Sequence, residues 1–218
     1  ARTWASPSTL LALPFDRHAC LQRIGRLASE VPATRLPRRS TLARTVADLA
    51  EIMAPPMISV VLPLYNGERY VEAAVRSILS QSLGRFQIIA VDDAGPEPTL
   101  ARVEAMRGQI EAEGHRLDVV IQAQNSGVAA ARNAGAALAD GAYLSWLDQD
   151  DLWPAERTAV LLGALQASGA MVARGRMRFV DLAPAAVRPW VREHWFQGDH
   201  PGYALGAVLC RLDVLSQI

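Results

Sequence analysis

The chain has 218 residues, of which 22 are basic and 22 acidic, so its formal net charge at pH 7 is zero. Half of the residues are apolar. The high apolar content and the zero net charge together exclude a disordered chain and a protein that binds nucleic acid through bulk charge. Cys20 and Cys210 form no CxxC pair, which disfavours a disulfide framework or a structural zinc site and favours a reducing cytoplasm. No apolar run reaches the roughly 18 residues that a membrane span needs.

The segment 1–56 differs from the rest because its arginines outnumber its acidic residues. Two helices are predicted in it, one over 17–30 and a second that Ser40 caps and that runs to about Met53. We expect a helical hairpin packed on the following domain; the alternative is a basic surface for an acidic membrane or a protein partner. The predicted domains are therefore a helical segment, 1–56, and a larger domain, 57–218.

From Met57 onward, short apolar runs alternate with segments of helical periodicity. Strands that are apolar throughout and alternate with helices indicate a parallel sheet covered on both faces. The predicted fold class is therefore α/β with a mainly parallel sheet, in which ligands bind beyond the carboxyl ends of the strands. We expect strands over 58–62, 86–91, 119–121 and 142–147, and helices over 68–81, 99–110, 127–138 and 154–167.

Polar residues follow the first two predicted strands. Pro63 stiffens the exit of the first strand, Tyr65 offers a flat face for a nucleobase, and Asn66 is placed to cap the next helix. A simple strand-to-helix turn explains this motif equally well. Asp92 and Asp93 end the second strand, where a carboxylate can accept a hydrogen bond from the imide N–H of uracil or thymine. On its own, a turn or a helix cap is the simpler interpretation of this pair.

The third predicted strand is followed by Asn125-Ser126-Gly127 and an alanine-rich helix. Gly127 allows close backbone approach at the start of that helix, and its small residues bring the helix tight against the sheet. Arg132 lies about a turn and a half into the helix, where its guanidinium could reach a phosphate or a carboxylate. An arginine that only neutralises nearby acids is an equally good interpretation.

The fourth predicted strand ends in Asp148-Gln149-Asp150-Asp151. Three carboxylates at a strand end are unfavourable unless a positive charge lies among them, because like charges raise one another's pKa. A divalent cation such as Mg²⁺ or Mn²⁺ favours oxygen ligands and often carries a substrate's phosphates. Asp150 is the best candidate for contact with the metal, and Asp148 suits a ribose hydroxyl or a metal-bound water. Asp151 is predicted to cap the helix at Pro154.

The order of these motifs closely resembles family 2 glycosyltransferases of the GT-A fold, specifically over 58–154 and more loosely to Ile218. The motifs are Pro-Leu-Tyr-Asn, Val-Asp-Asp, Asn-Ser-Gly-Val-Ala-Ala-Ala-Arg-Asn-Ala-Gly and Leu-Asp-Gln-Asp-Asp-Leu-Trp. The resemblance implies an inverting transferase that uses a nucleotide-diphospho-sugar, of the uridine or thymidine type, and a divalent metal, Mn²⁺ or Mg²⁺. It also implies a saccharide, a lipid-linked molecule or another hydroxyl compound as acceptor.

Carried over by motif, the resemblance implies that Pro63, Tyr65 and Asp93 hold the base. Asp148 would contact the ribose or the metal, Asp150 the metal, and Arg132 would lie beside the donor. The predicted metal ligands are Asp150 and Asp148. The predicted donor-binding residues are Pro63, Tyr65, Asn66, Asp92, Asp93, Asn125, Gly127, Arg132 and Asp148.

The chain departs from the family pattern in two places. The family usually follows its Asp-Asp with Gly-Ser, whereas this chain has Ala94-Gly95, so a different local turn is predicted. The family's general base lies in an acidic motif that would follow Ile218, and 206–211 reads as the lead-in to that region. We therefore expect the chain to hold the donor-binding half of a cytoplasmic enzyme, with the inner face of the membrane as an alternative setting. The alternative function is a truncated, catalytically silent module that binds a nucleotide-sugar or regulates a partner.

Overall fold

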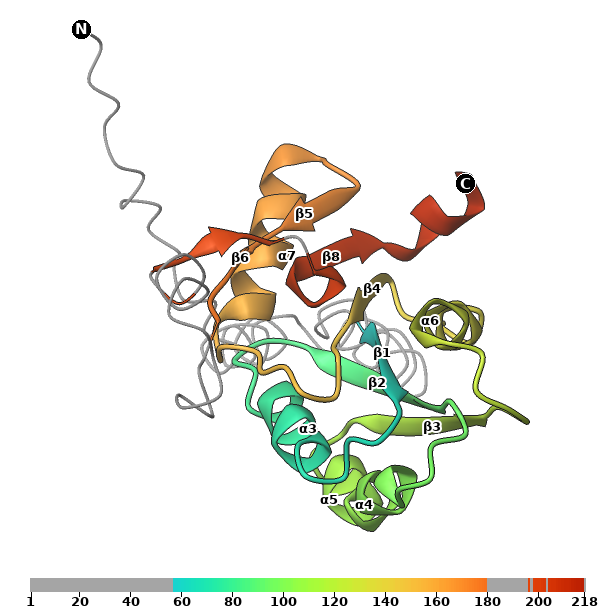
Figure 1. Ribbon diagram of the computed structural model, residues 1–218. Helices are drawn as coiled ribbons and strands as arrows, with labels where there is room; N and C mark the ends of the chain where they lie inside the picture. Colours follow the sequence, from blue (N-terminus) through green and yellow to red (C-terminus); the bar gives the residue numbers. More distant parts are fainter. Residues whose placement is uncertain (1–56, 180–195, 197, 203, 218) are drawn as a thin grey trace, which may run out of the picture. The chain divides into compact units, whose positions relative to one another are not determined.

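A computed structural model of the protein describes residues 57–179, 196, 198–202 and 204–217 (Figure 1). The two helices predicted before Met57 lie outside the described residues. Strands and helices alternate through the first half of the domain, as the apolar runs predict. The elements are β1 (Met57–Leu64), α3 (Val71–Leu79), β2 (Arg85–Asp92), α4 (Thr99–Ala105), α5 (Arg107–Ala112), β3 (Arg116–Ile121), α6 (Val128–Ala136), β4 (Tyr143–Trp146), α7 (Arg157–Ser168), β5 (Val172–Arg174), β6 (Arg176–Met177), β7 (His200–Pro201), η2 (Leu205–Ala207), β8 (Val208–Arg211) and η3 (Leu212–Gln217).

Within the described residues, the main sheet has six strands in the order β3-β2-β1-β4-β8-β5. The four predicted strands pair in parallel, which confirms the predicted fold class. Sequence analysis did not identify the last two strands of the sheet, β8 and β5, both of which are antiparallel to their neighbours. A separate antiparallel pair joins β6 to β7. The sheet is thus parallel where the predicted site lies and antiparallel at its β5 edge.

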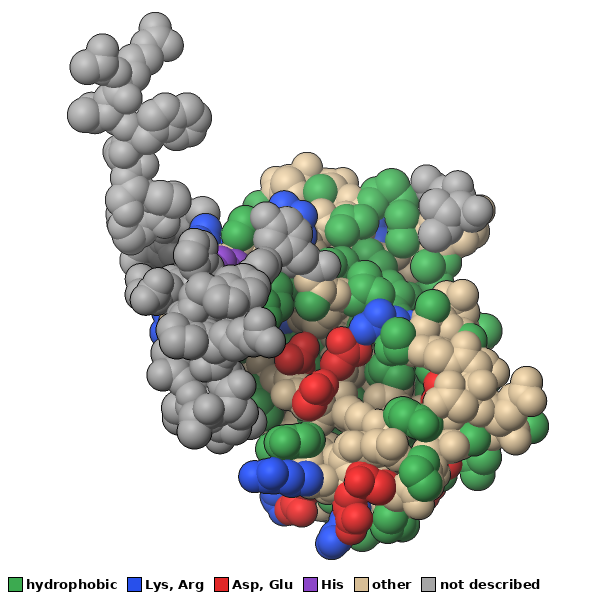
Figure 2. All heavy atoms as spheres, in the orientation of Figure 1, with side chains coloured by type: hydrophobic (Ala, Val, Ile, Leu, Met, Phe, Trp, Pro, Cys, Tyr) green, Lys and Arg blue, Asp and Glu red, His purple; other side chains and the backbone are tan. Residues whose placement is uncertain are grey.

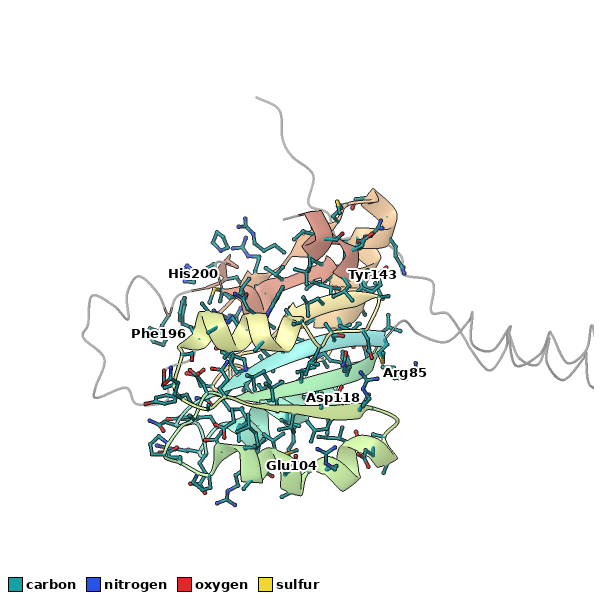
Figure 3. All side chains as sticks on the ribbon, turned by 90° about the vertical axis from the view of Figure 1, so that its right-hand side faces the viewer. Arg85, Glu104, Asp118, Tyr143, Phe196 and His200 are labelled. Carbon is teal, nitrogen blue, oxygen red and sulfur yellow. The ribbon has the colours of Figure 1, made fainter. Side chains whose placement is uncertain are left out.

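The two faces of the sheet carry two apolar cores, because successive side chains of a strand point to opposite sides. From β1, Ile58, Val60, Leu62 and Leu64 pack into the core on the side of α3, α4, α5 and α7. Val61 packs on the other side, against α6 and η3. Figure 3 shows α6 over one face of the sheet and the α4–α5 pair on the opposite side. The sheet is covered on both faces, as its uniformly apolar strands predict.

The observed helices are shorter than their predicted counterparts. The helix predicted over 99–110 is divided at Met106, whose N–H bonds to the Val103 carbonyl three residues back and closes a tight turn. Val103, Met106 and Ile110 nevertheless all face the same core, which is why one apolar period covers both helices. The helix predicted to begin at Pro154 begins at Arg157. Among the described residues, no helix combines the length and the apolar character that crossing a membrane would require.

Opposite ends of the sheet are marked by labelled side chains in Figure 3. Arg85 and Tyr143, the first residues of β2 and β4, lie at one end, and Phe196 and His200 lie at the other. The segment that contains β7 is therefore on the side of the carboxyl ends of the parallel strands. This is the side on which parallel α/β sheets bind ligands.

His115 directly precedes β3, at the end of the sheet opposite the carboxyl ends of the parallel strands. We expect it to make the stability of the fold depend on pH. Its Nδ1 accepts a hydrogen bond from the Phe86 N–H at 3.2 Å, and its ring packs on the Phe86 ring with the centroids 5.4 Å apart. Burial lowers the pKa of His115 from its ordinary value of 6.5. Because the folded state binds a proton less readily than the unfolded chain, this contribution to stability is complete above pH 6.5 and is lost as the pH falls.

We therefore expect the free energy of unfolding to decrease between pH 7.5 and pH 5. A His115→Asn variant keeps an acceptor near Nδ1 but does not titrate, so its stability relative to the wild type should improve as the pH falls. Urea denaturation of both proteins across this range measures the difference. A difference that is constant with pH would show that His115 does not contribute to the pH dependence.

Candidate functional site

A cavity of about 250 Å³ opens beyond the carboxyl ends of the parallel strands. Its wall is built by the loops that follow β1, β2, β3 and β4, so all four predicted polar clusters contribute to it. Such convergence follows from the parallel pairing, which brings the carboxyl ends of these strands to one edge. The lining residues are Pro63, Leu64, Tyr65, Asp93, Asn125, Gly127, Val128, Ala131, Asp148, Gln149 and Asp150.

Six of the predicted donor-binding residues line this cavity, namely Pro63, Tyr65, Asp93, Asn125, Gly127 and Asp148, and so does Asp150. Asn66, Asp92 and Arg132 do not line it. Asn66 adopts a left-handed conformation with φ 54°. It does not cap the following helix, contrary to prediction, because Tyr70 occupies the N-cap position of α3 and makes no side-chain cap bond there.

Tyr65 and Pro63 form the side of the cavity after β1. Pro63 is the buried penultimate residue of β1, whereas Tyr65 is 44% exposed. A tyrosine whose ring is accessible on the wall of a cavity can stack on a flat ligand. The stiff proline and the accessible ring thus provide a fixed apolar surface at this side.

Asp93 holds the loop before α6 through its buried carboxylate. Only 3% of Asp93 is exposed, and its two oxygens accept hydrogen bonds from the N–H groups of Ser126 at 2.8 Å and Gly127 at 2.9 Å. Gly127 has φ 86°, a conformation that residues with a Cβ rarely adopt, so glycine suits the turn that leads from this loop into α6. Asp93 therefore fixes the part of the cavity wall formed by the loop before α6. Sequence analysis did not predict its bonds to Ser126 and Gly127.

Asp92, the other acid of this pair, is partly buried, and among the described residues its carboxylate makes no hydrogen bond. The two neighbouring acids are thus structurally distinct.

Ala94 follows this pair in a left-handed conformation with φ 55°. The departure from Gly-Ser at this position therefore leaves an alanine in the backbone conformation that favours glycine, and the side chain is exposed. An L-residue in the left-handed conformation costs about 1–2 kcal/mol of folding free energy. Glycine avoids this strain but loses part of the gain, because its unfolded chain has greater conformational entropy.

Replacing Ala94 by glycine is therefore expected to raise the free energy of unfolding by about 0.5–1 kcal/mol. The matched control is Ala101→Gly, an exposed position inside α4, where the same substitution should lower it by about 0.5–1 kcal/mol. Urea denaturation of the two variants gives both signs in one experiment. Equal destabilisation by the two substitutions would refute the strain at Ala94.

Acidic side chains gather in the middle of the face shown in Figure 2, where Figure 1 has the loop after β4. Arg132 reaches this loop from α6, and its Nη2 donates to both carboxylate oxygens of Asp148, at 2.6 and 2.8 Å. The buried Nε of Arg132 has no hydrogen-bond partner among the residues that the structure describes. Arg132 thus supplies the positive charge that three neighbouring carboxylates require, and Asp150 remains exposed on the cavity wall.

Asp151 differs from its two acidic neighbours. It does not line the cavity, and it does not cap α7 as predicted, because that helix begins at Arg157 with Glu156 at the N-cap position. Its backbone N–H instead donates to the Asp148 carbonyl at 3.0 Å in a turn. Partial burial raises the pKa of the Asp151 carboxyl, and the negative charges of Asp148 and Asp150 raise it further.

A divalent cation at this site would need ligands beyond the protein side chains. Among the described residues, no group of three or more His, Cys, Asp or Glu side chains is arranged to hold a metal ion. Asp148 and Asp150 nevertheless line the same cavity and provide the carboxylate oxygens that hard cations prefer. Protein sites for Mg²⁺ commonly use one or two carboxylates and complete the coordination with water and substrate phosphates.

Two side chains at this end of the sheet were missed by sequence analysis. Gln149 lines the cavity between the two predicted metal ligands. Arg157 packs over the Trp153 ring at 3.9 Å and donates to the carbonyl oxygens of Gly206 at 3.0 Å and Val208 at 2.9 Å. Burial lowers the pKa of Arg157 to about 9. The position of Arg157 after the Leu-Trp-Pro stretch could have suggested a contact with Trp153, but its carbonyl partners lie about 50 residues away.

The sheet and its cavity define an α/β protein of the GT-A class, and solved structures with the same fold support this. The chain is similar to Staphylococcus aureus TarS 1–349 in complex with UDP, with a TM-score of 0.58 and 22% identity over 74% of this chain and 48% of that one. It is also similar to the mannosyltransferase PcManGT of Pyrobaculum calidifontis in complex with GDP-Man and Mn²⁺. There the TM-score is 0.52 and the identity 23%, over 58% of this chain and 37% of that one.

The chain belongs to glycosyl transferase family 2, whose model matches residues 59–199. It is 37% identical over 102 residues to TuaG of Bacillus subtilis (strain 168), a glycosyltransferase whose name refers to teichuronic acid biosynthesis, covering 47% of this chain and 39% of TuaG. It is 28% identical over 101 residues to WfgD of Escherichia coli, named as a UDP-Glc:alpha-D-GlcNAc-diphosphoundecaprenol beta-1,3-glucosyltransferase, covering 46% of this chain and 38% of WfgD. The match thus spans well under half the length of both relatives.

Proposed function

We propose that the cavity at the carboxyl ends of β1, β2, β3 and β4 is the donor site of an inverting glycosyltransferase, which binds a nucleoside-diphosphate sugar together with Mn²⁺ or Mg²⁺. One observation carries the proposal: an accessible tyrosine and two carboxylates, Tyr65, Asp148 and Asp150, line the same cavity in a family 2 glycosyltransferase domain. Similar structures are complexes with UDP, with UDP-GlcNAc, and with GDP-Man and Mn²⁺, which supports this class of ligand.

Tyr65 and Asp93 form the base end of the proposed site. The Tyr65 ring would stack on the nucleobase, and Pro63 fixes the strand exit that carries it. Each carboxylate oxygen of Asp93 accepts one backbone N–H and retains acceptor capacity, so it can also accept the imide N–H of a uracil or thymine ring. Uridine and thymidine donors are therefore favoured. Asn66 and Asp92 lie off the lining, and we assign them to the support of this end.

Asp150 and Asp148 form the cation end of the proposed site. Asp150 is exposed on the wall and is free to contribute an oxygen ligand, while Arg132 fixes the orientation of Asp148 toward a ribose hydroxyl or the cation. A bound cation would neutralise the charge that develops on the departing nucleoside diphosphate. The guanidinium of Arg132 adds positive charge at the same end, and Asn125 and Gly127 close the wall between the two ends.

The acceptor hydroxyl would attack the anomeric carbon from the face opposite the leaving group while a carboxylate removes its proton. We place that general base after Ile218, and we expect a saccharide, a lipid-linked molecule or another hydroxyl compound as acceptor and the cytoplasm as the setting. We assign the segment around His200 to the flank of the acceptor site, because it lies at the same end of the sheet as the carboxyl ends of the parallel strands (Figure 3).

The test of this function is the binding of UDP, dTDP, GDP and UDP-GlcNAc to the 218-residue chain, with Mn²⁺ and with a chelator. We expect at least one nucleotide to bind only with the cation, and at about 100 times its Kd to stabilise the protein by about 2.7 kcal/mol in thermal unfolding. Equally strong binding in the chelator, or no binding of any of the four, would overturn the proposal. Binding without turnover in a longer chain that includes the acidic motif would favour the silent module.

A further inference from the structure

Gln149 lies on the cavity wall between Asp148 and Asp150, and its amide group holds the loop after β1. Its Oε1 accepts a hydrogen bond from the Tyr65 N–H at 2.9 Å, and its Nε2 donates to the Tyr65 carbonyl at 2.5 Å. A side-chain amide is both a donor and an acceptor, so one glutamine satisfies both backbone groups of Tyr65. The contact joins two loops that are 84 residues apart in the sequence.

The loop after β1 is shaped to receive this amide. A Cβ added to Gly67 would lie 2.1 Å from Cδ of Gln149, so a larger residue there would displace the glutamine side chain. The φ of Asn66, 54°, turns the chain between Tyr65 and Gly67. Both features open the space that the Gln149 side chain fills.

We propose that Gln149 is a positioning residue, which fixes Tyr65 relative to Asp150 and so sets the spacing between the base end and the cation end of the donor site. This role rests on the proposed function of the cavity. Gln149 lies between Asp148 and Asp150 in the sequence, and its side chain bonds to the backbone of Tyr65, from which the tyrosine ring projects. Glutamate at this position would keep the acceptor for the Tyr65 N–H but would place a carboxylate against the Tyr65 carbonyl.

The experiment measures the affinity for UDP, dTDP and GDP with Mn²⁺, using the nucleotide that the wild type binds most tightly. Gln149→Ala should weaken binding about tenfold, because two hydrogen bonds that order Tyr65 are lost. The affinity for pyrophosphate with Mn²⁺, which lacks the base, should stay within about twofold. Gly67→Ala should reproduce the loss, since only the flexible end of Gln149 has to move, and it should add nothing in the Gln149→Ala background.

A double-mutant cycle with Tyr65→Ala tests whether the loss of affinity in Gln149→Ala depends on Tyr65. If it does, Gln149→Ala should cost little in a Tyr65→Ala background, whereas full additivity of the two losses would overturn the positioning role. Gln109→Ala, on the exposed surface of α5, is the matched control and should bind as the wild type does. Thermal unfolding verifies that each variant is folded, and Gly67→Ala provides the test if Gln149→Ala is not.

The outcomes separate this role from the proposed function. If the wild type binds none of the three nucleotides with Mn²⁺, the proposed donor site is wrong and the role of Gln149 fails with it. If the wild type binds and Gln149→Ala binds equally well, only the role of Gln149 is wrong. A loss of pyrophosphate affinity equal to the loss of nucleotide affinity would also refute it, because Gln149 would then act on the cation end.

Discussion

Replacing Asp150 by alanine is expected to remove the cation-dependent binding of nucleoside diphosphates, with a loss of affinity of about 100-fold or more. Asp150 lines the cavity, is exposed, and makes no ion pair with an arginine among the described residues, so its charge is available to a cation. Bringing a diphosphate into a wall of carboxylates without that cation is unfavourable because like charges repel. Isothermal titration with UDP or GDP in Mn²⁺ measures the loss.

The fold should tolerate this substitution, since exposed side chains outside special structural features usually change stability by less than about 0.5 kcal/mol. The matched control is Asp151→Ala, which removes the same charge one residue later at a position off the cavity. We expect Asp151→Ala to bind within about threefold of the wild type. Retained binding in Asp150→Ala together with lost binding in Asp151→Ala would mean that the roles of the two acids have been exchanged.

The parallel half of the sheet was predictable from the sequence because its strands are apolar throughout and are separated by helical periods. The antiparallel half was not, because β8 and β5 are short and their partners are distant. Leu209 in β8 pairs with Ser145 in β4 and with Ala173 in β5, and no local pattern records either pairing. The start of α7 differed from the prediction for a local reason. The Asp151 N–H bonds to the Asp148 carbonyl and the Arg157 N–H to the Pro154 carbonyl, and these two turns precede the helix, which begins at Arg157.

The walls of the candidate site were also predictable, because parallel strands bring their carboxyl ends together and the polar clusters follow those ends. The contacts between the clusters could not be predicted in the same way. Asp93 bonds to Ser126 and Gly127, and Gln149 bonds to Tyr65, across 33 to 84 residues of sequence. Residue type indicates that a carboxylate or an amide can form such bonds, but only the fold determines which backbone groups it meets.

Asp93→Asn is expected to lower the free energy of unfolding by about 2–3 kcal/mol and to weaken nucleotide binding as well. The buried carboxylate accepts two backbone N–H groups, and hydrogen bonds to a charged acceptor contribute more than neutral ones. Asparagine can accept only one of them, through Oδ1, and its NH₂ group would face the other N–H. One of the two N–H groups would then lose its bond to residue 93 (the Gly127 N–H also lies 3.1 Å from Oδ1 of Asn125), and the loop of Asn125 and Gly127 would lose its buried anchor.

Asp92→Asn is the matched control because it makes the same chemical change in the adjacent residue, whose carboxylate makes no hydrogen bond among the described residues. Its stability should stay within about 0.5 kcal/mol of the wild type. Urea denaturation gives both values, and an unchanged m-value would show that the midpoint reports stability. Equal stability of the two variants would contradict the anchoring role of Asp93. A destabilised Asp93→Asn that still binds UDP as tightly as the wild type would separate the anchor from the base contact, because the remaining acceptor oxygen would then suffice for the nucleotide.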